Sequence, residues 1–223
     1  MSRILQNMSV QPALNLHAWE ERFKSHLLAH ASFDAGHDLE HIQRVVLSAR
    51  RIALQENAEL NVVLPAAWLH DCVIVPKDSP LRKQASRLAA DAAKVFLESG
   101  GYPEQHLDAI HHAILTHSFS AGIPPETLEA KIVQDADRLD ALGSIGIARC
   151  LMLGGSMGRA LYHPQDPFGE SRMHDDLTYT IDHFFVKLFK LPSQMHTQAA
   201  REEAEKRVGV MRQFLEQLGR EVG

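Results

Sequence analysis

The stretch LPAAWLHDCVIVP, from Leu64 to Pro76, is the most informative part of this sequence. His70 and Asp71 are its only ionisable groups apart from the weak thiol of Cys72. Its apolar composition predicts a helix that is buried nearly all round, where an imidazole and a carboxylate are costly unless they are paired or bind a metal. Adjacent helical residues point roughly 100° apart. A shared third partner is therefore favoured over the alternative, a mutually satisfied core pair.

Helical periodicity dominates the rest of the chain. Apolar residues recur at spacings of three and four, and strand-type alternation is nearly absent. These spacings predict helices near residues 17–31, 38–58, 84–98, 103–117 and 126–142. A Gly-, Pro- and Asp-rich irregular stretch runs from Gly154 to Asp176, and we expect a helix over Leu177–Leu188 and an amphipathic helix over Ser193–Gly219 after it. The predicted fold class is all-α, a multi-helix bundle.

Composition and charge narrow the classes of partner. The 223 residues carry 28 acidic and 23 basic side chains, a formal charge of −5. Because duplex binding relies on clustered Lys and Arg, long nucleic acids are disfavoured. No stretch approaches the roughly 20 apolar residues of a membrane span, and the first residues lack a signal peptide's apolar run. We expect a cytoplasmic protein with one domain over residues 1–223, comprising a metal-site core at about 34–142 and a C-terminal helical part at about 143–223.

Two further segments supply candidate partners for the His-Asp pair. His41, in GHDLEHIQRVV, borders the buried side of its predicted helix, although a lone histidine there also fits a structural role. Asp137, in KIVQDADRLDALG, follows the core-facing Ala136 and is placed to point inward. Asp135 and Asp140 are expected on an exposed acidic face. Two imidazoles and two carboxylates form a mixed nitrogen and oxygen ligand set, which suits a divalent transition metal better than calcium, an ion that prefers oxygen ligands alone.

This H…HD…D pattern resembles the HD-domain family of metal-dependent phosphohydrolases, and the strings HxxRV, LHD and DADRLDALG strengthen the likeness. The resemblance implies an α-helical fold in which a metal is held by four residues: His41, His70, Asp71 and Asp137. Binuclear relatives usually place another histidine soon after the HD pair. None lies between Cys72 and Gln105. We therefore expect one divalent ion, Mn, Co, Ni, Fe or Zn, with Mg as a further option.

The stretch HDCVIVPKDSPLRKQAS is similar to that of small bacterial HD hydrolases, some of which resemble nucleotide pyrophosphohydrolases. A Pro-punctuated turn with cationic donors suits a phosphate chain, and an ordinary solvated basic turn is the alternative. Substrate contacts are predicted from Arg44, Lys77, Arg82, Ser86, Arg138, His183 and Lys187.

Catalytic roles are assigned to three residues. Asp71 is a candidate acceptor of the water proton, and Lys77 is a candidate stabiliser of developing phosphate charge. His117 is a candidate proton donor to the leaving group, with a structural role as the alternative. One branch of the family can carry an acidic residue one turn after the HD pair. Here position 74 is Ile, which leaves the general base open.

The predicted function is hydrolysis of a small phosphorylated compound, a nucleotide in the first instance. Cleavage of a nucleoside triphosphate to monophosphate and pyrophosphate is favoured over cleavage of a monophosphate. Two alternatives remain: a di-iron oxygenase on a similar scaffold, which needs two irons, and a non-catalytic module that binds a nucleotide as a signal. The sequence leaves monomer and homodimer equally open.

Overall fold

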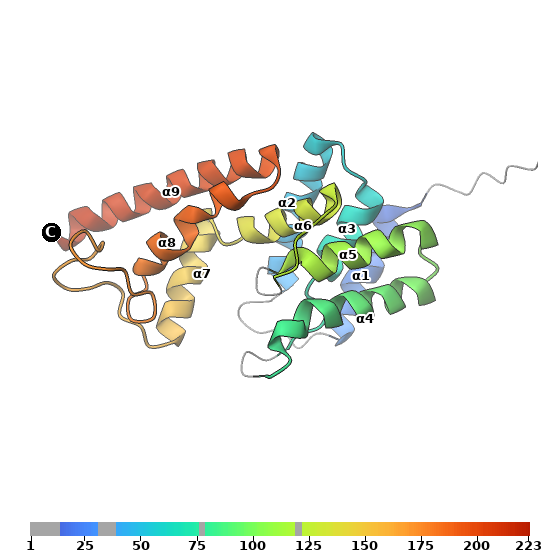
Figure 1. The fold of residues 1–223 in the computed structure, drawn as a ribbon, viewed down its shortest axis with the longest axis horizontal. Coiled ribbons are helices and arrows are strands. Elements are labelled where there is room, and N and C mark those ends of the chain that lie inside the picture. The colour runs from blue at the N-terminus through green and yellow to red at the C-terminus, as the bar shows by residue number, and fades with distance from the viewer. Residues whose placement is uncertain (1–13, 31–38, 76–78, 119–121) are drawn as a thin grey trace, which may run out of the picture.

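The computed structural model describes residues 14–30, 39–75, 79–118 and 122–223, and these residues form helices joined by loops, the longest described loop running between α7 and α8 (Figure 1). The α1–α6 part comprises α1 (Leu16–His30), α2 (Leu39–Glu56), α3 (Leu60–Leu69), α4 (Ala85–Ser99), α5 (Leu107–His117) and α6 (Leu128–Leu139). The α7–α9 part comprises α7 (Gly143–Ser156), α8 (Asp182–Val186) and α9 (Gln198–Val222). Single 3-10 turns are η1 (Arg82–Gln84), η2 (Glu104–His106), η4 (Leu188–Lys190) and η5 (Pro192–Gln194). The predicted all-α class is confirmed.

Helix α3 lies at the centre of the α1–α6 part and packs against α1, α2, α4, α5 and α6. Every residue from Val62 to Leu69 is buried, as the apolar sequence predicts. Pro65 lies inside the helix and has no N–H to donate to the carbonyl of Asn61, one turn earlier. The Tyr102 hydroxyl donates to that carbonyl instead, at 2.7 Å. The Asn61 carbonyl therefore has a hydrogen-bond partner despite the proline.

Helix α3 ends earlier than the sequence predicts. Its last residue is Leu69, and His70 is the C-cap. The β-branched run Val73–Val75 follows shortly and immediately precedes Pro76 in the sequence, and both features disfavour a continuing helix. His70 and Asp71 consequently lie at the end of a buried helix, where the chain turns, rather than within it.

Asp135 of α6 forms hydrogen bonds with the residues that immediately precede α9. This carboxylate accepts the backbone N–H of His196 at 3.0 Å and both the N–H and the hydroxyl of Thr197 at 2.8 Å. Thr197 in turn caps α9 by accepting from the N–H of Ala200. The prediction of an exposed Asp135 is wrong, because α9 covers this side of α6 and supplies donors to a carboxylate that is fully buried.

The C-terminal helices also differ in extent from the prediction. Of Leu177–Leu188 only α8 is α-helical, because the backbone N–H groups of Thr180 and Ile181 bond the carbonyls of Ala160 and Leu161 at 2.9 Å instead of forming a helical turn. The Asp182 carboxylate also holds the preceding loop, accepting from Arg172 at 2.5 and 2.8 Å and from the N–H of Asp175 at 2.6 Å. Helix α9 begins at Gln198 rather than Ser193, after its threonine cap. Among the described residues, no helix has the length and apolar character that crossing a membrane requires.

Candidate metal centre and substrate cavity

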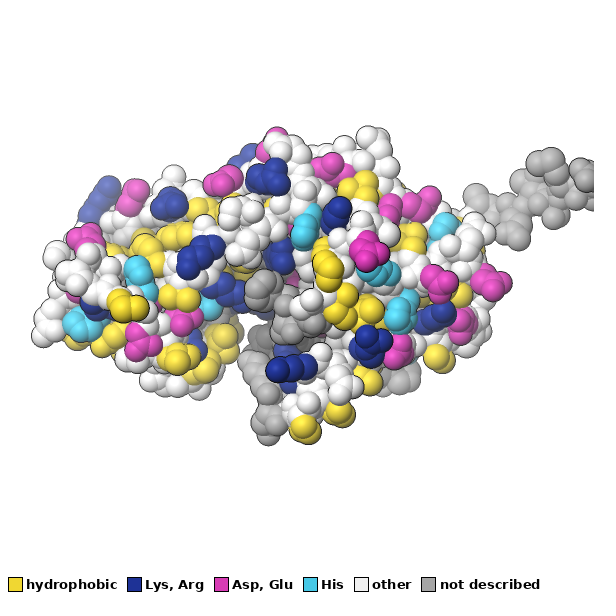
Figure 2. Space-filling view, viewed as in Figure 1, with side chains coloured by type: hydrophobic (Ala, Val, Ile, Leu, Met, Phe, Trp, Pro, Cys, Tyr) yellow, Lys and Arg dark blue, Asp and Glu magenta, His cyan; other side chains and the backbone are white. Residues whose placement is uncertain are grey.

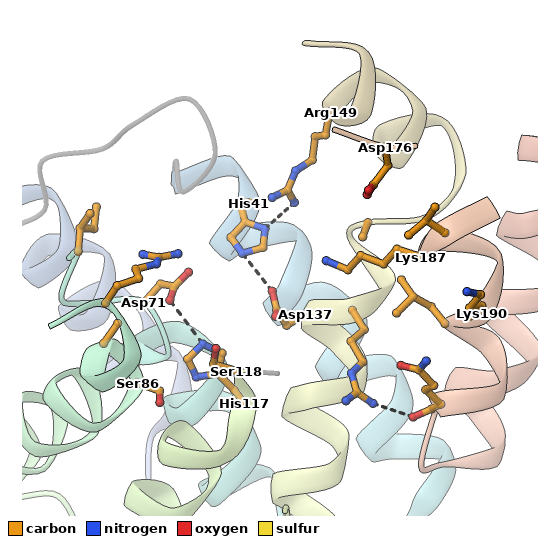
Figure 3. Close-up of a pocket in the computed structure, with 18 of the residues that line it drawn as sticks. His41, Asp71, Ser86, His117, Ser118, Asp137, Arg149, Asp176, Lys187 and Lys190 are labelled. Carbon is orange, nitrogen blue, oxygen red and sulfur yellow. Dashed lines mark hydrogen bonds and ion pairs between the residues drawn. The ribbon is translucent and has the colours of Figure 1, made fainter. Parts of the chain in front are cut away.

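Four residues from three helices converge in the α1–α6 part. His41 comes from α2, His70 and Asp71 from the end of α3, and Asp137 from α6. Ligand atoms of His41, His70 and Asp71 all lie within 4.8 Å of one another. The Nε2 atom of His41 is 3.4 Å from Nε2 of His70. It is also 3.4 Å from Oδ1 of Asp137 (Figure 3). The structure therefore brings together all four residues for which a metal-binding role is predicted.

The donor set fits a divalent ion. Nδ1 of His70 lies 2.8 Å from the carbonyl oxygen of Ala67, an atom that only accepts, so Nδ1 carries the proton. Nε2 of His70 is then the basic nitrogen, and it faces Oδ2 of Asp71 at 3.6 Å. Two imidazole nitrogens beside two carboxylates are the mixed set that divalent transition metals favour.

The charges at this centre respond strongly to one another. Burial lowers the pKa of His41, but its hydrogen bonds with Asp137 and Asp140 outweigh burial and raise the pKa to about 9. Burial raises the pKa of Asp137, whereas the interaction with His41 lowers it to about 2. Burial lowers the pKa of His70. A positively charged His41 ring thus balances the carboxylates, and a metal ion would have to displace one of its two ring protons on binding.

His117, the last residue of α5, lies beside Asp71. Its Nδ1 is 2.6 Å from the carbonyl of Ile114, and its Nε2 is 3.5 Å from Oδ1 of Asp71 (Figure 3). Burial lowers the pKa of His117, but Asp71 more than compensates and raises it. The neighbouring histidines have other partners: His111 bonds Asp91 at 2.8 Å, and the ring of His112 accepts a backbone N–H at 3.1 Å.

A cavity of about 630 Å³ opens onto this centre. His41, Asp71, His117 and Asp137 line it, and residues of the α7–α9 part form the opposite wall. The cationic side chains that line the cavity are Arg82, Arg138, Arg149, Lys187 and Lys190. Figure 2 shows a hollow between the α1–α6 and α7–α9 parts with Lys and Arg side chains beside it. The candidate metal centre and a group of cations therefore share one space.

Four of the predicted substrate contacts line this cavity: Arg82, Ser86, Arg138 and Lys187. Arg82 also donates to the carbonyl of Val75 at 2.9 Å, and Arg138 donates to that of Gln194 at 2.6 Å. These bonds hold each guanidinium in place at the wall.

The other predicted contacts are placed differently. Arg44 donates to Asp140 at 2.7 and 3.1 Å and does not line the cavity. His183 also lies off the cavity wall, 2.7 Å from Asp176, which does line it. Lys77 lies outside the described residues, so its predicted role remains a prediction.

Sequence reasoning missed several residues of the site. Asp140 was expected on an exposed face, yet it is 3% exposed, because its carboxylate meets His41, Arg44 and Arg149. Arg149 is the one charged residue in the otherwise apolar or small sequence of α7, the same signal that marks the HD pair. Asp176 and Lys190 follow no comparable pattern in the sequence.

The helical fold and the His/Asp centre agree with the comparisons with known proteins. The HD domain family model matches residues 38–142, and the chain belongs to the HD-domain family. A curated relative, the uncharacterized protein YpgQ of Bacillus subtilis, is 36% identical over 192 residues, which cover 84% of this chain and 85% of YpgQ.

Solved structures extend the similarity over nearly the whole chain. The crystal structure of Bacillus subtilis YpgQ in complex with ADP has a TM-score of 0.70 and 35% identity, covering 91% of this chain and 95% of that one. An HD-superfamily hydrolase from Bacillus thuringiensis has a TM-score of 0.69 and 32% identity, covering 91% of this chain and 97% of that one. The likeness therefore includes the α7–α9 part, beyond the residues that the family model matches.

Proposed function

We propose that the protein is a metal-dependent phosphohydrolase of small phosphorylated compounds and that its substrate is a nucleoside triphosphate, cleaved to monophosphate and pyrophosphate. The observation that carries this proposal is a cavity of about 630 Å³ that the His/Asp centre and, among the described residues, five cationic side chains line together. Its volume falls in the range of small-molecule sites. The ADP complex of YpgQ supports a nucleotide as the ligand.

The distribution of charge supports a polyphosphate over a monophosphate. Arg82 lies on the α1–α6 side of the cavity, whereas Arg149, Lys187 and Lys190 lie on the α7–α9 side. In Figure 3 the Lys187 side chain extends from the turn between α8 and η4 toward His41 and Asp137. Cations on two walls can bind successive phosphate groups, and guanidinium groups are well matched to phosphate oxygens. A single phosphate would engage only part of this set.

We assign the proton transfers of the proposed hydrolysis to Asp71 and His117. A divalent ion bound by His41, His70, Asp71 and Asp137 would lower the pKa of an attacking water and neutralise phosphoryl charge. Asp71 accepts the proton of that water as the oxygen attacks the α-phosphorus. His117 donates its Nε2 proton to the departing pyrophosphate, and its 3.5 Å separation from Asp71 then allows a proton to pass back. The Ile114 carbonyl keeps the ring oriented throughout.

The test begins with protein stripped of metal and reloaded separately with Mn, Mg, Co, Ni or Zn. Nucleoside mono-, di- and triphosphates are then screened with phosphate and pyrophosphate measured separately. The expected product is pyrophosphate from triphosphates, dependent on metal and abolished in Asp71→Ala. Release of neither product with any metal would contradict the proposal and favour a non-catalytic nucleotide-binding module.

A further inference from the structure

Asp140 forms a buried cluster behind the candidate metal centre. Its carboxylate, at the C-cap of α6, lies 2.7 Å from Nδ1 of His41. Arg44 of α2 binds both carboxylate oxygens, Nε to Oδ1 at 2.7 Å and Nη2 to Oδ2 at 3.1 Å. Arg149 of α7 contacts Oδ2 as well. Three helices thus meet on one carboxylate that solvent hardly reaches.

These contacts determine which nitrogen of His41 carries a proton. Arg44 and Arg149 both donate to Asp140 and hold it ionised, so its oxygens can only accept. A separation of 2.7 Å between Oδ2 and Nδ1 therefore requires a proton on Nδ1. Arg149 also lies 3.2 Å from Nδ1 of His41. A protonated Nδ1 cannot accept a hydrogen bond from Arg149, so the two groups lie close because both donate to Oδ2 of Asp140. The opposite nitrogen, Nε2, is left to face Asp137 and His70.

We propose that Asp140 is a positioning residue for metal binding: it fixes the tautomer and the ring orientation of His41 so that Nε2 presents its lone pair to the ion. The inference rests on the metal site of the proposed function. A carboxylate behind a ligating imidazole also raises the basicity of the ligand. His70 has only the neutral carbonyl of Ala67 in the corresponding place. Asp140 therefore makes His41 the stronger of the two imidazole ligands.

The isosteric variant Asp140→Asn tests this inference. The Asn side chain has one oxygen and one NH₂ group, and the NH₂ group must face either Arg44 or His41. If the NH₂ group faces His41, it favours the tautomer with the proton on Nε2, which cannot bind a metal. A matched control is Asp182→Asn, since Asp182 is also fully buried and also held by an arginine, Arg172, but does not line the cavity.

Cobalt is the probe, because Co²⁺ titration reports affinity and the visible absorption of the bound ion reports its ligand field. We expect Asp140→Asn to weaken Co²⁺ binding by about 10- to 100-fold with an altered spectrum, and Asp182→Asn to keep the wild-type affinity and spectrum. Wild-type Co²⁺ affinity and spectrum in Asp140→Asn would overturn the inference about Asp140 without affecting the proposed metal site. An equal loss in both variants would overturn that inference too, since general destabilisation would then be the cause. Absence of Co²⁺ binding by the wild type would overturn the proposed metal site itself.

A measurement on the wild-type protein covers the case in which Asp140→Asn does not fold. Long-range ¹H–¹⁵N spectra of the Zn²⁺-loaded protein distinguish the two ring nitrogens of His41. The inference requires a protonated Nδ1 and a metal-bound Nε2. A metal-bound Nδ1 would overturn it.

Discussion

Tyr102→Phe removes a single hydroxyl from the support of helix α3, the helix that ends at the HD pair. Tyr102 is 4% exposed, and its hydroxyl bonds the Asn61 carbonyl that Pro65 leaves without a helical partner. The bond is partly buried, so its loss is expected to cost about 1 kcal/mol, the net value of a typical intramolecular hydrogen bond. For a chain of this size each kcal/mol lowers Tm by roughly 2–4 °C. The expected decrease in Tm is therefore roughly 2–4 °C.

A double-mutant cycle separates this mechanism from a general loss of packing. Pro65→Ala restores an N–H that can donate to the Asn61 carbonyl, so Tyr102→Phe should cost less in the Pro65→Ala background than in the wild type. The free energies of unfolding of all four proteins, measured by urea denaturation, give the coupling. An equal cost in both backgrounds would refute the reasoning, because the hydroxyl would then not replace the missing N–H.

Three other predictions concern the site. His117→Gln should lower kcat by about 10²- to 10⁴-fold with little change in KM, if its proton transfer is lost, and steady-state kinetics should show His111→Gln, on the same helix, close to wild type. Lys187→Ala should raise KM for a triphosphate by roughly 10- to 100-fold, the value of a charge-assisted hydrogen bond, and raise it less for a monophosphate; an equal rise for both would place Lys187 away from the phosphate tail. The metal-free protein should lose stability as pH rises from about 6.5 to about 9, because the pKa of His41 is raised from its ordinary value of 6.5 to about 9 in the folded state. The stabilisation from protonated His41 is complete below its pKa in the unfolded chain and is lost above its pKa in the folded protein. A Tm, measured in a chelating buffer, that does not decline over this pH range would contradict the prediction.

The convergence of the four residues of the candidate metal centre could be predicted from the sequence because its signals are local. An imidazole and a carboxylate inside an apolar stretch need an explanation whatever surrounds them, and the buried faces of α2 and α6 place His41 and Asp137 near the same core. Each of these inferences uses one segment at a time. The all-α class follows in the same way from periodicity within segments.

The missed features depend on contacts between distant segments. Periodicity identifies one core face for α6, but α9 covers a second side of that helix at Asp135, and Arg149 of α7 covers Asp140. The burial of Asp135 therefore depends on residues 61 and 62 positions further along the chain. The burial of Asp140 depends on how the chain turns between α6 and α7, which hydrophobic spacing does not predict. Lys190 and Asp176 reach the cavity only because the α7–α9 part packs beside the metal centre.

The most direct test of the central claim is the position of water attack on a nucleoside triphosphate. Metal-loaded protein is incubated with the triphosphate in ¹⁸O-labelled water, and the products are resolved by mass spectrometry. The account predicts one ¹⁸O atom in the nucleoside monophosphate and none in the pyrophosphate, with no reaction in Asp71→Ala. Label in inorganic phosphate beside a nucleoside diphosphate would show attack at the terminal phosphorus and contradict the account.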